Sequence, residues 1–300
     1  MAGQAEVALQ VDGLIRAALP NVNFALMLGI GMALRAGDFR QVAARPRGLL
    51  LGIAGQYVAL PLIGLGLALL FRHSYELAVG FVLLAASPSA NSSNALTWLA
   101  RGNLALAVSL TAVSSVLTLL TIPLFTGAAL LLFAGRSQPI ALPVGQMLPH
   151  LPLLALLPLL LGMAARQLLP GACRRIEPWL NRTSMLLLLL LIALIAVDQW
   201  PALRPWAGRL ALATTAMCAL AMFAGQLLAR SGRLEWRDAV TISLEVGVQN
   251  CTLAFLVAYN VLQSARVGMP AAIYGITMYF VAFVLVVASR RRPVAASASC

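Results

Sequence analysis

The 300-residue chain is too apolar to have the surface of a water-soluble domain. Hydrophobic residues make up 61% of it and charged residues 10%, whereas soluble domains contain about 25% charged residues. The formal net charge of +12 does not indicate nucleic-acid binding, because the basic residues are dispersed between apolar runs instead of forming one patch. We therefore predict an all-α polytopic membrane protein.

Nine apolar segments have roughly the length of about 20 residues that a transmembrane helix needs. In chain order they cover residues 17–35, 48–71, 77–100, 104–133, 147–168, 183–200, 207–229, 238–262 and 270–289. With this count, 15 of the 21 basic residues, all arginines, fall on one side of the membrane and 6 on the other. Short cytoplasmic loops are enriched in basic residues, so we expect nine transmembrane helices with the N-terminus outside and the C-terminus in the cytoplasm.

Within the third segment, a polar stretch reads Ser87-Pro88-Ser89-Ala90-Asn91-Ser92-Ser93-Asn94. Pro88 removes a backbone donor and disfavours helical geometry at the residue before it. The hydroxyl and amide side chains that follow can satisfy freed backbone groups or line a cavity, which lipid cannot do. We predict a broken helix at 87–94.

The eighth segment contains a second polar interruption, Leu244 to Asn250, with the sequence Leu-Glu-Val-Gly-Val-Gln-Asn. An ionisable side chain at membrane depth costs about 2.5 to 3.5 kcal/mol on insertion scales, and it is kept mainly where it faces a partner, an ion or water. Gly247 permits the helix to open, and Gln249 and Asn250 add neutral oxygens beside Glu245. Such a set suits a hard monovalent cation. The alternative, a structural carboxylate bonded within the bundle, is less favoured.

One interruption in each half of the chain, at 87–94 and 245–250, is typical of secondary transporters built from inverted repeats. We expect two crossed discontinuous helices. Their half-helix N-termini would lie at the midplane of the bilayer, where the positive ends of the helix dipoles attract an anionic group of a substrate.

Several motifs carry a family resemblance: Gly31-Met32, Asp38-Phe39, Gly55-Gln56, Pro61, Ser93-Asn94, Thr97, Ala100-Arg101-Gly102-Asn103, Thr111, Pro123 and the stretch from Glu245 to Asn250. Together they resemble the bile acid:sodium symporter family. The resemblance covers roughly residues 20 to 290, and the paired motifs are far more specific than either motif alone.

The resemblance implies inverted repeats of five helices, with core plus panel domains and with the first repeat lacking its first helix here. We expect the panel to contain spans one, five and six. The expected regions are an outer N-terminal segment at 1–16, a first repeat of four helices at 17–133, a linker at 134–146, a second repeat of five helices at 147–289, and a disordered cytoplasmic tail at 290–300.

The resemblance also implies two sodium sites and a substrate site. The first sodium site would use Ser93, Asn94, Thr111 and Glu245, and the second Gln56, Glu245, the carbonyls of Val246 and Val248, and Gln249. Asn91, Asn94 and Asn250 would face the organic substrate.

Two departures from the family's pattern affect these sites. Ala107 stands where the family supplies a hydroxyl to the first site, which leaves the number of sodium ions open between one and two. The stretch from Ser87 to Ala90 replaces the usual Cys-Pro-Gly-Gly, so the groups presented to the substrate differ.

We expect a secondary active transporter in the cell's inner (plasma) membrane that couples sodium entry to uptake of an organic anion, bile acid-like or a small carboxylate, by alternating access. The expected partners are sodium, this anion and the lipid bilayer, with a monomer sufficient. A proton-coupled or oxyanion transporter of the same fold, with Glu245 titrating, remains the alternative. A membrane-embedded enzyme or receptor is less favoured, because no second carboxylate or nucleophile–base pair lies near Glu245 in the sequence.

Overall fold

The computed structural model describes residues 46–134, 157–198, 200 and 204–291, together with residue 13 and residues 17, 18, 20–29, 31 and 32 of the first apolar segment. The regular elements within these residues are all helices. Most of the expected N-terminal segment, linker and tail lies outside them. The count of nine spans and the repeat boundaries therefore stay predictions.

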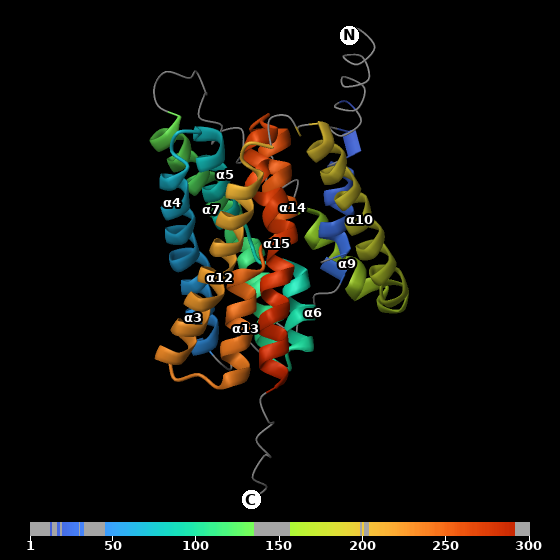
Figure 1. Cartoon of the computed structure of the whole chain (residues 1–300). Helices are drawn as coiled ribbons and strands as arrows, with labels where there is room; N and C mark the ends of the chain where they lie inside the picture. Colours follow the sequence, from blue (N-terminus) through green and yellow to red (C-terminus); the bar gives the residue numbers. More distant parts are fainter. Residues whose placement is uncertain are drawn as a thin grey trace, which may run out of the picture.

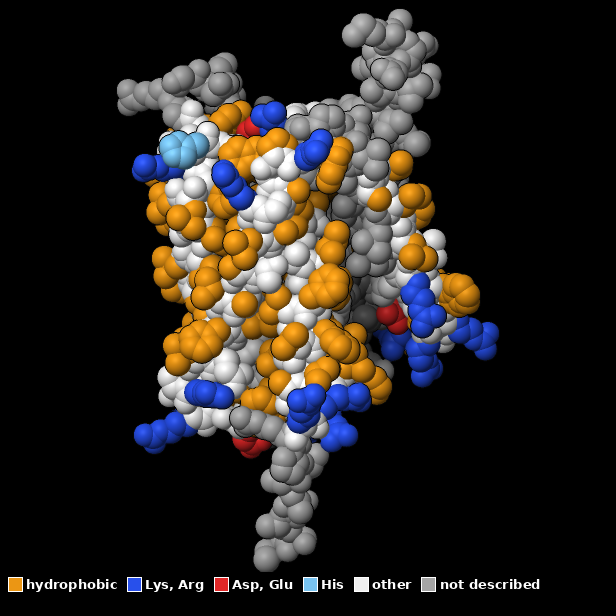
Figure 2. Space-filling model, in the orientation of Figure 1, with side chains coloured by type: hydrophobic (Ala, Val, Ile, Leu, Met, Phe, Trp, Pro, Cys, Tyr) orange, Lys and Arg blue, Asp and Glu red, His pale blue; other side chains and the backbone are white. Residues whose placement is uncertain are grey.

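Four continuous helices among the described residues are long and apolar enough to cross a membrane, at Pro46–Leu70, Leu104–Phe133, Ala207–Ser231 and Ala265–Arg290. The first is composed of α3 (Pro46–Ala54), the π-helical turn η1 (Gly55–Ala59) and α4 (Leu60–Leu70), and the others are α7 (Leu104–Phe133), α12 (Ala207–Ser231) and α15 (Ala265–Arg290). Figure 2 shows hydrophobic side chains exposed along the bundle and arginines near its two ends. This distribution is that of an integral membrane protein.

Two further segments are interrupted helices. One consists of α5 (Tyr75–Ala86) and α6 (Asn91–Leu99), and the other of α13 (Trp236–Gly247), α14 (Cys251–Leu256) and the π-helical turn η3 (Val257–Val261). Ser87 and Val248, the residues after α5 and α13, have extended backbones. Pro88 has no backbone N–H to donate, and it disfavours helical geometry at Ser87 before it. Helix α5 therefore cannot continue through this point.

The two gaps between half-helices pair with each other. Ser89 and Gln249 form an isolated antiparallel bridge. The backbone N–H of Asn250 donates to the carbonyl of Pro88 at 2.8 Å, and the N–H of Ala90 donates to the carbonyl of Val248 at 2.9 Å. Each gap therefore satisfies backbone groups that the other gap frees, as apolar surroundings require.

The described helices form two groups (Figure 1). The core group comprises α3 to α7 and α12 to α15. The panel group comprises the helical residues 20–29, α9 (Leu157–Leu168) and α10 (Pro170–Asp198). Within the panel group the backbones of Gly31 and Gly162 approach closely, and a Cβ on Gly162 would overlap the carbonyl oxygen of Leu28. Small residues at such crossings let membrane helices pack tightly.

The start of α10 differs from the sequence-based prediction. The predicted segments 147–168 and 183–200 leave residues 169–182 between them, but the helix already begins at Pro170 and includes Arg174, Arg175 and Pro178. Proline is well tolerated at the first helical position, since its missing N–H would have no partner there. The two arginines are exposed, and a helix can extend beyond the apolar core of the bilayer when its polar side chains reach the interface.

Gly80 sets how closely α5 packs on α15. A Cβ at this position would overlap the backbone oxygen of Val267 and lie 2.9 Å from the side chain of Pro270. Gly66, on α4, offers a matched comparison, because a Cβ there would meet no atom within 4 Å.

We predict that Gly80→Ala lowers the melting temperature of the purified protein and that Gly66→Ala raises it slightly. The first change overpacks a contact with backbone that cannot move aside, at about 1–3 kcal/mol, whereas the second favours the helix by about 0.5–1 kcal/mol. Thermal unfolding of both variants in the same detergent measures the difference. Equal melting temperatures would contradict the packing described.

Candidate functional site

Glu245 lies near the end of α13, and its side chain is 2% exposed. Its Oε2 accepts hydrogen bonds from Ser89 Oγ at 2.7 Å and from Thr111 Oγ1 at 2.9 Å. Its Oε1 accepts a hydrogen bond from Ser93 Oγ. Across the described ranges no cationic side chain forms an ion pair with this carboxylate. Hydroxyl groups alone therefore satisfy a buried acidic side chain, an arrangement that leaves a negative charge without a counter-charge.

The three hydroxyls come from three different parts of the core group. Ser89 lies in the gap between α5 and α6, Ser93 in the first turn of α6, and Thr111 within α7. The Thr111 hydroxyl is also 3.0 Å from the carbonyl oxygen of Ala107, one turn earlier in its own helix. Because Glu245 belongs to the other interrupted helix, its carboxylate joins both interruptions and α7 at one point.

A pair of buried glutamines, Gln56 and Gln249, also lies at the paired gaps. Gln56 Nε2 donates to Gln249 Oε1 at 2.8 Å, and Gln249 Nε2 donates back to Gln56 Oε1 at 3.2 Å. Gln56 Nε2 also donates to the carbonyl of Ser87 at 2.9 Å, and Gln249 Nε2 to that of Val246 at 2.7 Å. Gln56 belongs to the π-helical turn η1, a local distortion that often occurs at functional positions.

The residues predicted for the first sodium site are only partly joined by hydrogen bonds. Ser93 and Thr111 contact Glu245 directly. Asn94 follows Ser93 in α6, and its Oδ1 atom is buried with no hydrogen-bond partner in the described part of the chain. This atom is an acceptor without a donor, which is a property expected of a ligand whose partner is a cation.

The residues predicted for the second sodium site gather around the glutamine pair. The carbonyl of Val246 accepts from Gln249, and the carbonyl of Val248 accepts from the N–H of Ala90. A carbonyl oxygen has two lone pairs, so each retains one acceptor position beyond these bonds.

The predicted substrate residues lie at the starts of the second half-helices. Asn91 is the first residue of α6 and is half-buried. Asn250 precedes α14, where its Oδ1 accepts from the N–H of Leu253 at 3.1 Å and so caps the helix. The capping bond gives Asn250 a structural role in addition to the predicted one.

Three residues of this region were not assigned to the site from the sequence. Ser89 donates to Glu245, Ser114 Oγ lies 3.4 Å from Ser89 Oγ, and the Tyr274 hydroxyl donates to the carbonyl of Gly247, at the end of α13, at 2.7 Å. For Ser89 the sequence offers little signal, because helical periodicity does not apply inside a gap and the pairing of two gaps about 160 residues apart is not visible in either motif. Ser114 lies three residues after Thr111 in α7, so helical spacing places it next to a predicted ligand.

The donor set is suited to a sodium ion. It consists of carboxylate, hydroxyl, side-chain amide and backbone carbonyl oxygens, the ligands that hard cations prefer. It includes the buried Asn94 oxygen that lacks a donor. The oxygen donors present therefore fit the sodium ion that is predicted from the sequence.

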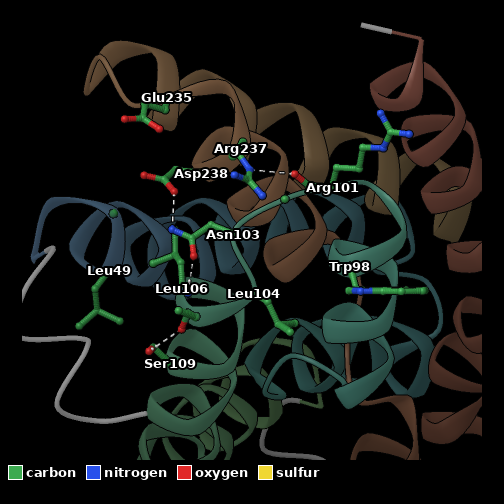
Figure 3. Close-up of a pocket in the computed structure, with 13 residues that line it drawn as sticks. Leu49, Trp98, Arg101, Asn103, Leu104, Leu106, Ser109, Glu235, Arg237 and Asp238 are labelled. Carbon is green, nitrogen blue, oxygen red and sulfur yellow. Dashed lines mark hydrogen bonds between the residues drawn. The ribbon is translucent and has the colours of Figure 1, made fainter. Parts of the chain in front are cut away.

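A cavity of about 760 Å³ opens at the end of the core group where α6 ends and α7 and α13 begin. Figure 3 shows Asn103 and Asp238 pointing toward each other at this cavity, with Asn103 Nδ2 donating to Asp238 Oδ1 at 2.7 Å. Arg237 Nε donates to the carbonyl of Arg101 at 3.1 Å. Ser109, two residues before Thr111 in α7, also lines the cavity.

Comparisons with known proteins place these features in a context. The sequence profile described as "Sodium Bile acid symporter family" matches residues 22–204. The chain is 28% identical over 258 residues to the "Probable sodium/metabolite cotransporter BASS2, chloroplastic" of Oryza sativa subsp. japonica, which covers 84% of this chain and 59% of that protein.

Two other relatives match over similar lengths. The "Uncharacterized sodium-dependent transporter YocS" of Bacillus subtilis is 26% identical over 84% of this chain and 76% of its own length. The "Probable sodium/metabolite cotransporter BASS6, chloroplastic" of Arabidopsis thaliana is 29% identical over 89% of this chain and 66% of its own length. The chain thus spans less than two thirds of the length of some relatives. All three are described as transporters and not as enzymes.

We predict that Gln56 and Gln249 are energetically coupled. Replacing either by alanine leaves the partner amide buried with unused donors, whereas replacing both removes the mismatch. A double-mutant cycle of unfolding free energies in mixed micelles should therefore give a coupling energy of about 1 kcal/mol, as for other polar pairs inside membrane proteins. Strictly additive effects of the two changes would contradict the reciprocal bonds.

Proposed function

The chain belongs to the sodium bile acid symporter family, and from this premise we propose that it is a secondary active transporter that couples sodium entry to uptake of a small organic anion. The main support is the Glu245 carboxylate of the second interrupted helix, which hydroxyls from the first interrupted helix and from α7 contact without a cationic partner among the described residues. The names of the relatives, which mention sodium and metabolites, agree with this proposal.

Sodium bound at this point would neutralise the carboxylate and draw the surrounding oxygens toward one centre. Ser93, Asn94, Thr111 and Glu245 would hold one ion. Gln56, Glu245, the carbonyls of Val246 and Val248, and Gln249 would hold another.

The organic anion would bind next to these ions, at the half-helix starts marked by Asn91, Asn94 and Asn250. The N-terminal ends of α6 and α14 carry partial positive charge from the helix dipole. Since most ligands of the ions belong to the same two interrupted helices, ion binding would fix the position of these ends. The affinity for the anion then depends on sodium, and the affinity for sodium depends on the anion by the same factor.

Alternating access would follow from movement of the core group against the panel group. The cavity beside Asn103 and Asp238 is also lined by Arg101 and Arg237, and the positive-inside bias would make this end of the core group the cytoplasmic one. Asp238 and Glu245 are seven residues apart in α13, or about 10 Å along the helix axis. A short route from the ion site to the cytoplasm through this cavity is consistent with release on that side, and with an outer N-terminus and an inner C-terminus.

The direct test is uptake by the protein reconstituted in lipid vesicles. Radiolabelled candidate anions, namely bile acids, small carboxylates and sulfonates, are offered with an inward gradient of sodium, potassium or choline. We predict accumulation of at least one anion with sodium only. Uptake that is indifferent to the cation would defeat the proposal, and uptake driven by a pH gradient in sodium-free buffer would instead identify proton coupling.

A second prediction concerns Glu245 itself. Sodium should raise the melting temperature of the parent protein at constant ionic strength, because a ligand that binds only the folded state stabilises it. Glu245→Gln keeps the size of the side chain and removes its charge, so its melting temperature should no longer respond to sodium. An equal response in both proteins would show that the ion binds elsewhere.

A further inference from the structure

Ser89 lies in the gap between α5 and α6, and it is 3% exposed. Serine hydroxyls inside helices often bond to the carbonyl four residues earlier, as Ser87 Oγ does with Leu83 at 3.0 Å. Ser89 lies outside any helix, and its backbone pairs with Gln249 of the other gap. Its hydroxyl is directed instead to Glu245 Oε2, at 2.7 Å.

The surroundings of the Ser89 hydroxyl consist of further oxygen atoms. Thr111 Oγ1 and Ser114 Oγ each lie 3.4 Å from it. The N–H of Ser89 is also 3.4 Å from Ser114 Oγ. The Ser89 hydroxyl is thus buried and adjacent to a carboxylate, and α7 contacts both the backbone and the side chain of this residue. A hydroxyl in these surroundings can serve as a ligand of a cation.

The neighbouring turn of α7 lacks an oxygen that would otherwise face this point. Ala107 and Thr111 are four residues apart, and therefore lie on the same face of the helix. Ala107 is fully buried, and its methyl group offers no ligand. Of these two positions, only Thr111 contributes an oxygen to the cluster.

We propose that the Ser89 hydroxyl is a ligand of the first sodium site and supplies the oxygen that Ala107 lacks. The inference rests on the proposed function. The first site then has side-chain oxygens from Ser89, Ser93, Asn94, Thr111 and Glu245, and its ligand set is complete without α7 providing a second hydroxyl. A hydroxyl that donates its proton to the carboxylate retains lone pairs for a cation.

The position of Ser89 also links the two sodium sites. Its side chain contacts Glu245, and its backbone pairs with Gln249, whose amide belongs to the second site. The following residue, Ala90, donates to the carbonyl of Val248. A cation held by Ser89 therefore fixes the backbone that presents Val248 and Gln249, and occupation of the first site favours occupation of the second.

The test measures sodium affinity without transport. The full-length protein in detergent is titrated with sodium against choline, and the melting temperature gives an apparent dissociation constant. Ser89→Cys keeps the volume and replaces a hard oxygen by a sulfur that sodium does not accept. We expect Ser89→Cys and Ser89→Ala to weaken sodium binding about tenfold, as for loss of one contact to a charged group.

Ser115 provides the matched control. It lies on the same helix as Thr111, and its hydroxyl donates to the Thr111 carbonyl at 2.8 Å, without contacting Glu245. Ser115→Ala should therefore keep the sodium affinity of the parent. The double variant Ser89→Ala with Ala107→Ser returns a hydroxyl to the same cluster from α7, and should recover most of the lost affinity.

The outcomes separate this inference from the proposed function. One outcome is that sodium stabilises the parent and that Ser89→Cys and Ser89→Ala bind sodium as tightly as the parent does. The assignment of Ser89 as a ligand is then wrong, and the proposed function stands. If the parent does not respond to sodium at all, both are wrong. Loss of affinity in Ser115→Ala equal to that in Ser89→Ala would also overturn the inference, because the effect would then be a general weakening of the fold.

Discussion

The architecture depends on one constraint, the need to satisfy a carboxylate that lies in an apolar interior without a cationic partner in the described residues. Glu245 meets this constraint through hydroxyls from the first gap, from α6 and from α7. These donors are weak compared with an arginine, and their oxygens can also face a cation. The arrangement is therefore suited to an ion that enters and leaves, whereas an internal ion pair would satisfy the acid permanently.

The interrupted helices are the means by which the chain assembles these donors. A continuous helix uses its backbone groups internally, and its side chains project at fixed angles. Because α5 and α13 each end in the middle of the bundle, the segments after them run side by side and exchange backbone hydrogen bonds. The pairing places Ser89 next to Glu245 and Gln249 next to Gln56, and so brings two clusters of oxygen atoms to the same junction.

The sequence was informative where composition and breaking residues decide the structure, and less so elsewhere. The apolar segments predicted a membrane protein of helices, and the family resemblance agrees with the profile that matches residues 22–204. The start of α10 was missed because Pro178 and the nearby arginines have the composition of a loop, whereas the structure includes them in the helix. Ser89 was missed for a different reason: its neighbours depend on the pairing of the two gaps, which is a property of the tertiary structure alone.

The reciprocal bonding of the gaps has a consequence for the biosynthesis of this protein. The carbonyl of Pro88 and the N–H of Ala90 receive their partners from Asn250 and Val248, which leave the ribosome about 160 residues later. At a synthesis rate of about 5–20 residues per second, the first interruption waits for roughly ten seconds or more before its partner is made. During that interval water or the insertion machinery has to solvate these groups, since lipid cannot. Completion of the second interruption is thus the step that allows the first to leave a hydrated environment.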